Sequence, residues 1–236
     1  MACTPPLSLH SSTISDVRSS DVALSYRPDI DGLRAIAVLA VIAFHAFPAK
    51  VKGGFVGVDI FFVISGYLIS SILFTGLEKG TFSFIQFYAR RIRRIYPTLL
   101  VVFIACLVFG GFILLPDEYQ QLGKHTVGGA GFIANFVLWW ESGYFDSASE
   151  LKPLLHLWSL GIEEQFYIVW PFLLWVGWKG RWNLRRLVIG LGLVSLIWNV
   201  AICVRHPVMD FYSPMTRIWE LLAGALLAHG MLYPSQ

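Results

Sequence analysis

The chain has 236 residues, of which 56% are hydrophobic and 14% are charged, and its formal net charge is +3. This composition, with a mean hydropathy of +0.63, excludes an ordinary soluble domain and predicts an integral membrane protein. The three cysteines, Cys3, Cys106 and Cys203, are too far apart for a metal site or a disulfide framework. We expect no metal and no nucleic-acid partner.

The chain is predicted to consist of a polar tail followed by a membrane domain. Residues 1–25 are rich in Ser and Thr and lack an apolar core, which predicts a disordered cytoplasmic tail. Residues 26–236 form the membrane domain. Six of its segments are apolar and long enough, or nearly so, to span a bilayer: 33–47, 55–74, 98–115, 160–176, 187–204 and 218–232. The predicted fold class is therefore all-α, a polytopic membrane helix bundle with about six spans.

Two further segments are predicted to be helical without crossing the membrane. Residues 81–97 interleave aromatic and aliphatic side chains with four arginines, which predicts an amphipathic helix at the cytoplasmic face. Residues 127–140 are too few for a full span and predict a re-entrant or interfacial helix.

The basic residues predict the orientation of the bundle. Arginines and a lysine cluster at 90–94 and at 179–186, and the positive-inside rule places both clusters in the cytoplasm. An even number of crossings must then separate them, so segment 127–140 should not cross. This places the N-terminus in the cytoplasm and the loop 141–158 outside.

His45 lies inside the first apolar segment, and Arg34 precedes it by three helical turns. The two side chains would share one face of a helix, roughly 16 Å apart along its axis. Ionisable groups at such a depth usually handle a substrate, an ion or a proton. The alternative is a histidine that only packs against a neighbouring helix.

Asp59 lies one turn inside the outer end of the second apolar segment, at a depth similar to that of His45. A contact between the two is plausible, in which the carboxylate would orient the imidazole, as in a catalytic triad. The alternative is a solvated carboxylate that caps the helix end.

Arg91 and Arg94 are three residues apart on the amphipathic segment, a spacing that can hold a phosphate between two guanidinium groups. Their alternative role is to set the topology and to contact membrane lipids with anionic headgroups.

The segment 154–167 carries Trp158 and the adjacent Glu163 and Glu164 at the entrance of the fourth span. Adjacent residues on a helix point about 100° apart, so at most one of the two carboxylates faces a given pocket. His156, in the same segment, is expected to be solvated in the outer loop. Arg217 and Glu220, three residues apart at the start of the last span, are expected to pair with each other.

Four motifs in this order resemble the acyltransferase-3 family of integral membrane acyltransferases, which includes O-antigen and peptidoglycan O-acetyltransferases. They are YRPDIDGLR at 26–34 with His45 eleven residues after its last arginine, GVDIFFVISGY at 57–67, FYARRIRRIYP at 87–97 and LWSLGIEEQFY at 157–167.

The resemblance implies transfer of an acyl group, commonly acetyl from cytoplasmic acetyl-CoA, to a hydroxyl of an extracytoplasmic or lipid-linked glycan at the bacterial inner membrane. The family's Arg–x10–His motif matches Arg34 and His45. Its Arg–x–x–Arg motif matches Arg91 and Arg94, although Arg90 and Arg93 have the same spacing. The candidate site therefore has a catalytic set, a donor-binding set and a substrate-binding set: His45, Asp59 and Arg34; Arg91 and Arg94; Glu163, Glu164 and Trp158.

The chain departs from the family pattern in length. Family members usually have about ten membrane helices, so the domain is expected to be truncated at its C-terminus, without the esterase-like domain of some members. Two other functions stay open. One is a proton-coupled transporter in which His45, Asp59 and a glutamate relay protons. The other is a non-catalytic membrane subunit.

Overall fold

The computed structural model describes residues 27–142 and 152–234, which form helices and no strands. This confirms the all-α fold class. The predicted tail, 1–25, lies outside the described residues. The helices are α1 (Pro28–Ala46), α2 (Val56–Glu78), α3 (Phe84–Ile113), α4 (Pro116–Ala130), α5 (Ala134–Glu141), α6 (Leu157–Lys179), α7 (Leu184–Ile202), α8 (Pro207–Tyr212) and α9 (Pro214–Leu232).

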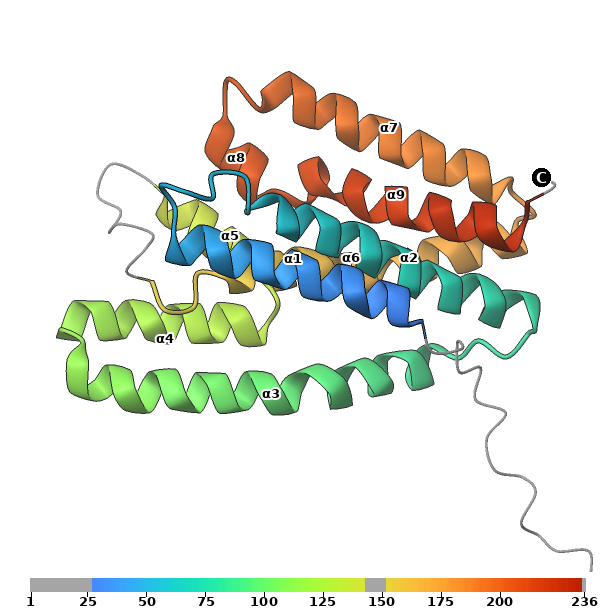
Figure 1. Ribbon diagram of the computed structural model, residues 1–236. Coiled ribbons are helices and arrows are strands. Elements are labelled where there is room, and N and C mark those ends of the chain that lie inside the picture. The colour runs from blue at the N-terminus through green and yellow to red at the C-terminus, as the bar shows by residue number, and fades with distance from the viewer. Residues whose placement is uncertain (1–26, 143–151, 235–236) are drawn as a thin grey trace, which may run out of the picture.

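Three of the described helices, α2, α3 and α7, are both long and apolar enough to cross a membrane. The protein is therefore an integral membrane protein. Helices α1, α6 and α9 have 19, 23 and 19 residues; α6 and α9 contain the predicted spans 160–176 and 218–232, and α1 covers all of 33–47 except its last residue. They run alongside α2 in Figure 1, while α3 and α4 form an antiparallel pair at one edge. The number of spans stays a prediction.

The predicted amphipathic segment 81–97 is not a separate helix, because α3 continues through Pro97 into the apolar segment that follows. A proline inside a helix removes one backbone hydrogen bond. Side chains on both sides of Pro97 are nevertheless buried, Phe87 before it and Leu99 after it. Packing on both sides of the proline keeps the two segments in one helix.

The predicted helix over 127–140 is also wrong as a single element. Helix α4 ends at Ala130, and the chain turns at Phe132, whose φ of 56° lies in the left-handed region. The amide of Ile133 donates to the carbonyl of Gly128 at 2.8 Å, which closes the end of α4 in the manner of a Schellman cap. Helix α4 also extends back over 116–126, where no helix is predicted.

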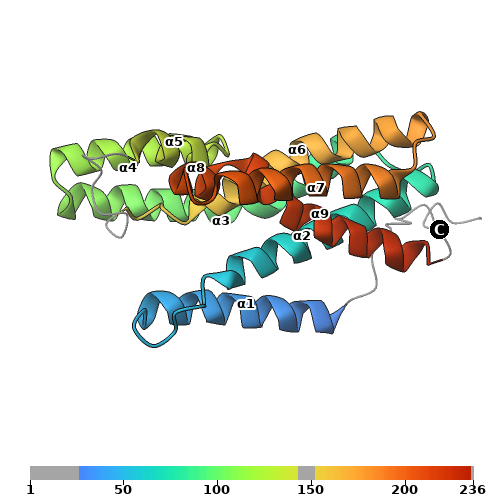
Figure 2. The same ribbon diagram turned by 90° about the horizontal axis from the view of Figure 1, so that it is seen from above.

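Helices α2 and α9 pack closely against each other, and Figure 2 shows them crossing. This close packing depends on two glycines. A Cβ atom on Gly66 would lie 1.9 Å from the carbonyl oxygen of Leu221, and one on Gly224 would lie 2.0 Å from that of Val63. Small residues allow such contacts between membrane helices, where packing rather than the hydrophobic effect holds the helices together.

The glycine contact predicts a specific stability loss. The change Gly66→Ala should destabilise the protein by about 1–3 kcal/mol, because the added methyl group forces α2 and α9 apart. The control is Gly190→Ala in the middle of α7, where nothing lies within 4 Å of the new methyl group. Thermal unfolding in detergent should show a lower midpoint for Gly66→Ala only. Equal midpoints would mean that the α2–α9 contact does not limit stability.

Candidate active site

A cavity of about 660 Å³ lies between α1, α2, α6 and the segment that leads into α9. Most of its wall is aromatic and aliphatic. Its ionisable lining residues are His45, Asp59, His156, Glu163 and Arg217, and Trp158 also lines it. The cavity thus brings together four of the eight candidate site residues. We call it the His45 cavity.

The imidazole of His45 faces the cavity with one nitrogen held. Its Nδ1 atom lies 2.8 Å from the carbonyl oxygen of Val41, one turn earlier on α1. A carbonyl oxygen only accepts hydrogen bonds, so Nδ1 carries the proton and donates it. The neutral ring then has its lone pair on Nε2, which is the arrangement that a general base or a nucleophile requires.

A second imidazole lies beside the first. The rings of His45 and His156 are 4.9 Å apart between centroids. His156 immediately precedes α6, and burial together with the nearby His45 lowers its pKa. The lowered pKa favours the neutral form of the His156 imidazole. From the sequence we expected a solvated His156. The fold instead brings His156 beside His45, although the two residues are far apart in the sequence.

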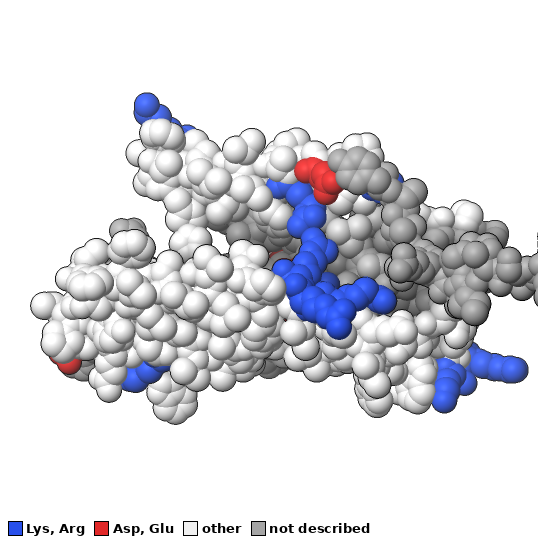
Figure 3. All heavy atoms as spheres, turned by 90° about the horizontal axis from the view of Figure 1, so that it is seen from below, with Lys and Arg blue, Asp and Glu red and all other residues white. Residues whose placement is uncertain are grey.

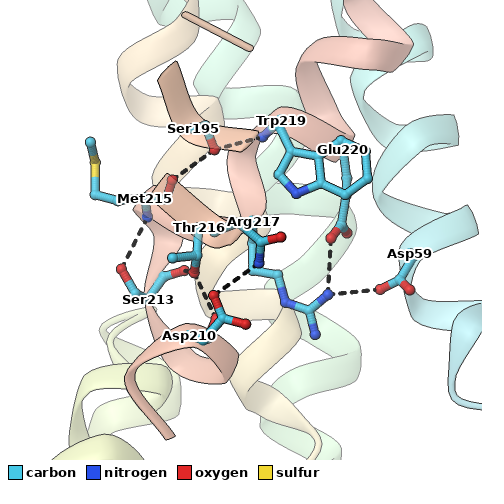
Figure 4. A network of polar contacts seen from close by, with 10 residues as sticks. Asp59, Ser195, Asp210, Ser213, Met215, Thr216, Arg217, Trp219 and Glu220 are labelled. Atoms are coloured by element: carbon cyan, nitrogen blue, oxygen red, sulfur yellow. Dashed lines mark hydrogen bonds and ion pairs between the residues drawn. The ribbon is translucent and has the colours of Figure 1, made fainter. Parts of the chain in front are cut away.

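Arg217 lies between two carboxylates at the wall of the cavity, as Figure 4 shows. Its Nη1 atom donates to Oδ1 of Asp59 at 3.0 Å and to Oε1 of Glu220 at 2.9 Å. The predicted Arg217–Glu220 pair is confirmed. The predicted contact in which Asp59 orients the His45 imidazole is absent, because Asp59 bonds to Arg217. A charged guanidinium attracts a carboxylate more strongly than a neutral imidazole does, and the Nδ1 proton of His45 already goes to Val41.

The position of Arg217 is set by the start of α9. The hydroxyl of Ser213 accepts a hydrogen bond from the amide of Met215 and caps the helix. Ser195 on α7 donates to the Met215 carbonyl at 2.7 Å and accepts from the Trp219 amide at 3.1 Å. These contacts fix the first turn of α9 against α7 and direct Arg217 toward α2 (Figure 4).

The two adjacent glutamates point to different partners, as their spacing predicts. Glu163 lines the cavity and accepts hydrogen bonds from the hydroxyls of Ser65 and Tyr167. Glu164 is buried and accepts a hydrogen bond from Arg91 at 2.8 Å. The Arg91 guanidinium also lies 3.6 Å from the centre of the Tyr167 ring. Tyr167 therefore links the cavity on one side to Arg91 on the other.

The predicted donor-binding arginines do not form a pair. Arg91 points inward to Glu164, whereas Arg94 is exposed together with Arg90 and Arg93. Figure 3 shows Lys and Arg side chains gathered in one group on the face that α3 forms. Arg34 does not line the His45 cavity, and its ion pair is with Asp31 at 3.8 Å.

Residues 27–230 match a family model described as an acyltransferase domain. The chain belongs to the acyltransferase-3 family. It is 42% identical over 223 residues to the peptidoglycan O-acetyltransferase OatA of Listeria monocytogenes, which covers 89% of this chain and 35% of that protein. It is 40% identical over 215 residues to the putative peptidoglycan O-acetyltransferase YrhL of Bacillus subtilis, covering 86% of this chain and 33% of that protein.

The O-acetyltransferase OatA of Staphylococcus aureus is 36% identical over 217 residues, which cover 86% of this chain and 34% of that protein. The chain thus spans about a third of the length of the curated relatives it matches. No solved structure matches the chain.

Several residues of the site were not predicted from the sequence. Ser65 and Tyr167 lie within the family motifs, and the spacing of Tyr167 four residues after Glu163 is a signal that could have identified it. Phe211 and Tyr212, on the short helix α8, carry no sequence signal for a place in the cavity wall. Residues 27–142 and 152–234 hold no group of three or more His, Cys, Asp and Glu side chains that could bind a metal ion.

The charge network predicts how stability responds to its removal. Glu220 is 2% exposed, so Arg217→Gln leaves a buried carboxylate without its cation and should cost about 3–5 kcal/mol. The double change Arg217→Gln/Glu220→Gln replaces that carboxylate by a neutral amide and should recover part of the loss. Thermal unfolding in detergent measures both. A double variant no more stable than the single one would show that Arg217 does not compensate Glu220.

Proposed function

We propose that this chain is the membrane acyltransferase domain of an O-acetyltransferase, and that it moves an acetyl group from cytoplasmic acetyl-CoA to a hydroxyl of an extracytoplasmic or lipid-linked glycan. The observation that carries this proposal is the His45 cavity. It contains an imidazole with its Nε2 lone pair free, inside a membrane protein of an acyltransferase family. Two similar proteins, a peptidoglycan O-acetyltransferase and a putative one, support the acceptor class.

In the proposed reaction, Nε2 of His45 takes the proton of the acceptor hydroxyl as its oxygen attacks the thioester carbonyl carbon. The carbon–sulfur bond then breaks, and the thiolate leaves with the proton returned by the imidazolium. General-base catalysis of this kind contributes roughly 10²–10⁴ in rate. The Val41 carbonyl holds the ring in the required tautomer. The lowered pKa of His156 reduces charge repulsion when His45 becomes positively charged. Direct acylation of His45 is the alternative covalent route.

The donor and the acceptor would approach from opposite ends of the site. The side chains of Arg34, on α1, and Arg94, on α3, reach the surface, and they can hold the phosphates of the donor in the cytoplasm. Arg91, linked to the cavity through Tyr167, would mark the inner limit of that site. On the outer side, Trp158 and Phe211, whose rings are 4.3 Å apart, provide aromatic faces for a sugar ring, and Glu163 provides a hydrogen-bond acceptor.

We propose the following placement in the bacterial inner membrane. Helices α1, α2, α3, α6, α7 and α9 cross it, α4 and α5 do not, and the N-terminus is cytoplasmic. This arrangement supports the reaction because it puts both basic clusters, 90–94 and 179–186, on the donor side. The His45 cavity then lies near the outer ends of α1 and α2, on the acceptor side.

The central test replaces the proposed base. The change His45→Ala should lower acetyl transfer by at least about 100-fold, since the base is lost, while membrane insertion is unchanged. The matched control is His206→Ala, because His206 is exposed and does not line the cavity. Transfer from radiolabelled acetyl-CoA to a glycan acceptor measures activity. Activity of His45→Ala above about a tenth of the unmodified protein would remove His45 from the mechanism.

The donor site is tested by changing arginines to lysines, which keep the charge but lose the two-pronged hydrogen bonding of guanidinium. The double variant Arg91→Lys/Arg94→Lys should insert normally and bind acetyl-CoA more weakly by about 1–3 kcal/mol. Arg90→Lys/Arg93→Lys, with the same spacing and charge, is the control. Calorimetry at fixed salt compares them. Equal acetyl-CoA affinities in the two variants would mean that Arg91 and Arg94 do not bind the donor and that the arginines of this segment only set the membrane topology.

A further inference from the structure

A second cavity lies away from the His45 cavity, where α2, α6, α7 and α9 meet at the right-hand end of Figure 1. Its volume is about 520 Å³. Its lining residues are Glu78, Trp178, Arg181, Trp182, Asn183, Leu184, Arg185, His229 and Tyr233. We call it the end pocket. Asp59 and Glu78 both lie on α2, and about 28 Å of helix axis separates them, so the end pocket does not reach the proposed reacting atoms.

In the membrane placement proposed above, the end pocket lies at a membrane surface. Two of the helices that are long and apolar enough to cross a membrane have their ends here, α2 at Glu78 and α7 at Leu184. Trp178 and Trp182 are 38% and 55% exposed. Tryptophan rings of this kind favour the boundary between hydrocarbon and water, where lipid headgroups lie. The basic residues of the turn place this surface on the cytoplasmic side.

The charge of the pocket favours an anion. Among the described residues, its charged lining side chains are Arg181, Arg185 and Glu78, and Glu78 accepts a hydrogen bond from the Tyr233 hydroxyl at 3.3 Å. Lys179 lies outside the pocket, with its ammonium 4.2 Å from the Trp175 ring centre. The formal charges of the three lining side chains, Arg181, Arg185 and Glu78, sum to +1. Basic pockets between membrane helices on the cytoplasmic side suit phosphate-bearing headgroups.

His229 points to a polar occupant of the pocket. The residue is only 5% exposed, and its ring packs against Phe74 and Tyr233. Its ring nitrogens have no hydrogen-bond partner within 27–142 and 152–234, and they are not enclosed, so they are open to the pocket that the residue lines. A buried imidazole usually has a hydrogen-bond partner. A phosphate oxygen in the pocket would provide one.

Arg181 has a backbone conformation that its side chain does not favour. Its φ is 55°, in the left-handed region, where the Cβ atom of a residue other than glycine lies too close to the backbone. The turn is held by hydrogen bonds from the Arg181 amide to the Trp178 carbonyl at 3.1 Å and from the Trp182 amide to the Gly177 carbonyl at 2.9 Å. A glycine would fit this turn better than the arginine does.

We propose that the end pocket binds the phosphate group of an anionic phospholipid headgroup, held by Arg181, Arg185 and His229, with the acyl chains of the lipid running along the outside of the bundle. This site is independent of the proposed acyltransferase reaction. It would fix the cytoplasmic ends of α2, α7 and α9 to the membrane surface.

The test uses the full chain purified in detergent. Phosphatidylglycerol should raise the midpoint of thermal unfolding, whereas phosphatidylcholine, whose headgroup has no net charge, should not. Inorganic phosphate at the same phosphate concentration should also leave the midpoint unchanged. An equal shift with phosphatidylcholine would overturn the proposal, and an equal shift with inorganic phosphate would overturn the lipid as the source of the phosphate. Displacement of phosphatidylglycerol by acetyl-CoA would reassign the pocket to the acyl donor.

The decisive variant is Arg181→Gly. It relieves the left-handed strain, so it should unfold at a higher temperature without lipid, and at the same time it should bind phosphatidylglycerol more weakly. The double variant Arg181→Gly/Arg185→Gln should bind roughly tenfold more weakly, equivalent to about 1.4 kcal/mol. Lys179→Gln/Arg186→Gln removes the same charge outside the pocket and should change the affinity less than about twofold. Native mass spectrometry measures the affinity of each double variant for phosphatidylglycerol. Equal losses of affinity would mean that the lipid is attracted only by the surface charge, and this result would overturn the proposed site.

Discussion

The contact between α2 and α9 is the constraint on which the candidate active site depends. Gly66 and Gly224 let the two helix backbones approach so closely that neither position has room for a Cβ atom. The same contact places Asp59, on α2, within 3.0 Å of Arg217, on α9. Because Arg217 lines the His45 cavity, a change in the distance between these helices would alter the cavity wall as well as the packing. Stability and the geometry of the site are therefore coupled through two glycines.

The ionisable side chains within the bundle fall into two groups. Most are already paired: Arg217 with Asp59 and Glu220, and Arg91 with Glu164. Pairing of this kind reduces the penalty of placing charge in a medium of low polarity, where an isolated charge is costly. His45 differs because its Nε2 atom is left facing the cavity. An imidazole with one proton on the ring is neutral, so it needs no counter-charge in such a site until it takes up a second proton during a reaction.

A series of direct contacts connects the two ends of the site. Glu163 lines the cavity, Tyr167 donates to Glu163, and Arg91 lies over the Tyr167 ring while it bonds to Glu164. These contacts join α6 to the basic part of α3. They hold Arg91 at the inner end of the proposed donor site, whereas Arg94 on the same helix is exposed. The end pocket lies apart from this series and has its own charge and aromatic lining.

The sequence alone determined the helical class, the apolar segments and the identity of the ionisable residues, because hydrophobic length and charge are local properties of the chain. It also predicted that Glu163 and Glu164 diverge, which follows from helix geometry. The tertiary structure decided the partners. Asp59 bonds to Arg217 instead of His45, and His156 lies beside His45, because helices far apart in sequence pack against each other. Likewise, α3 runs unbroken through Pro97 because residues on both sides of it are buried, whereas the turn at Phe132 divides 127–140. Pairing across helices depends on distance in space, which no spacing along the chain specifies.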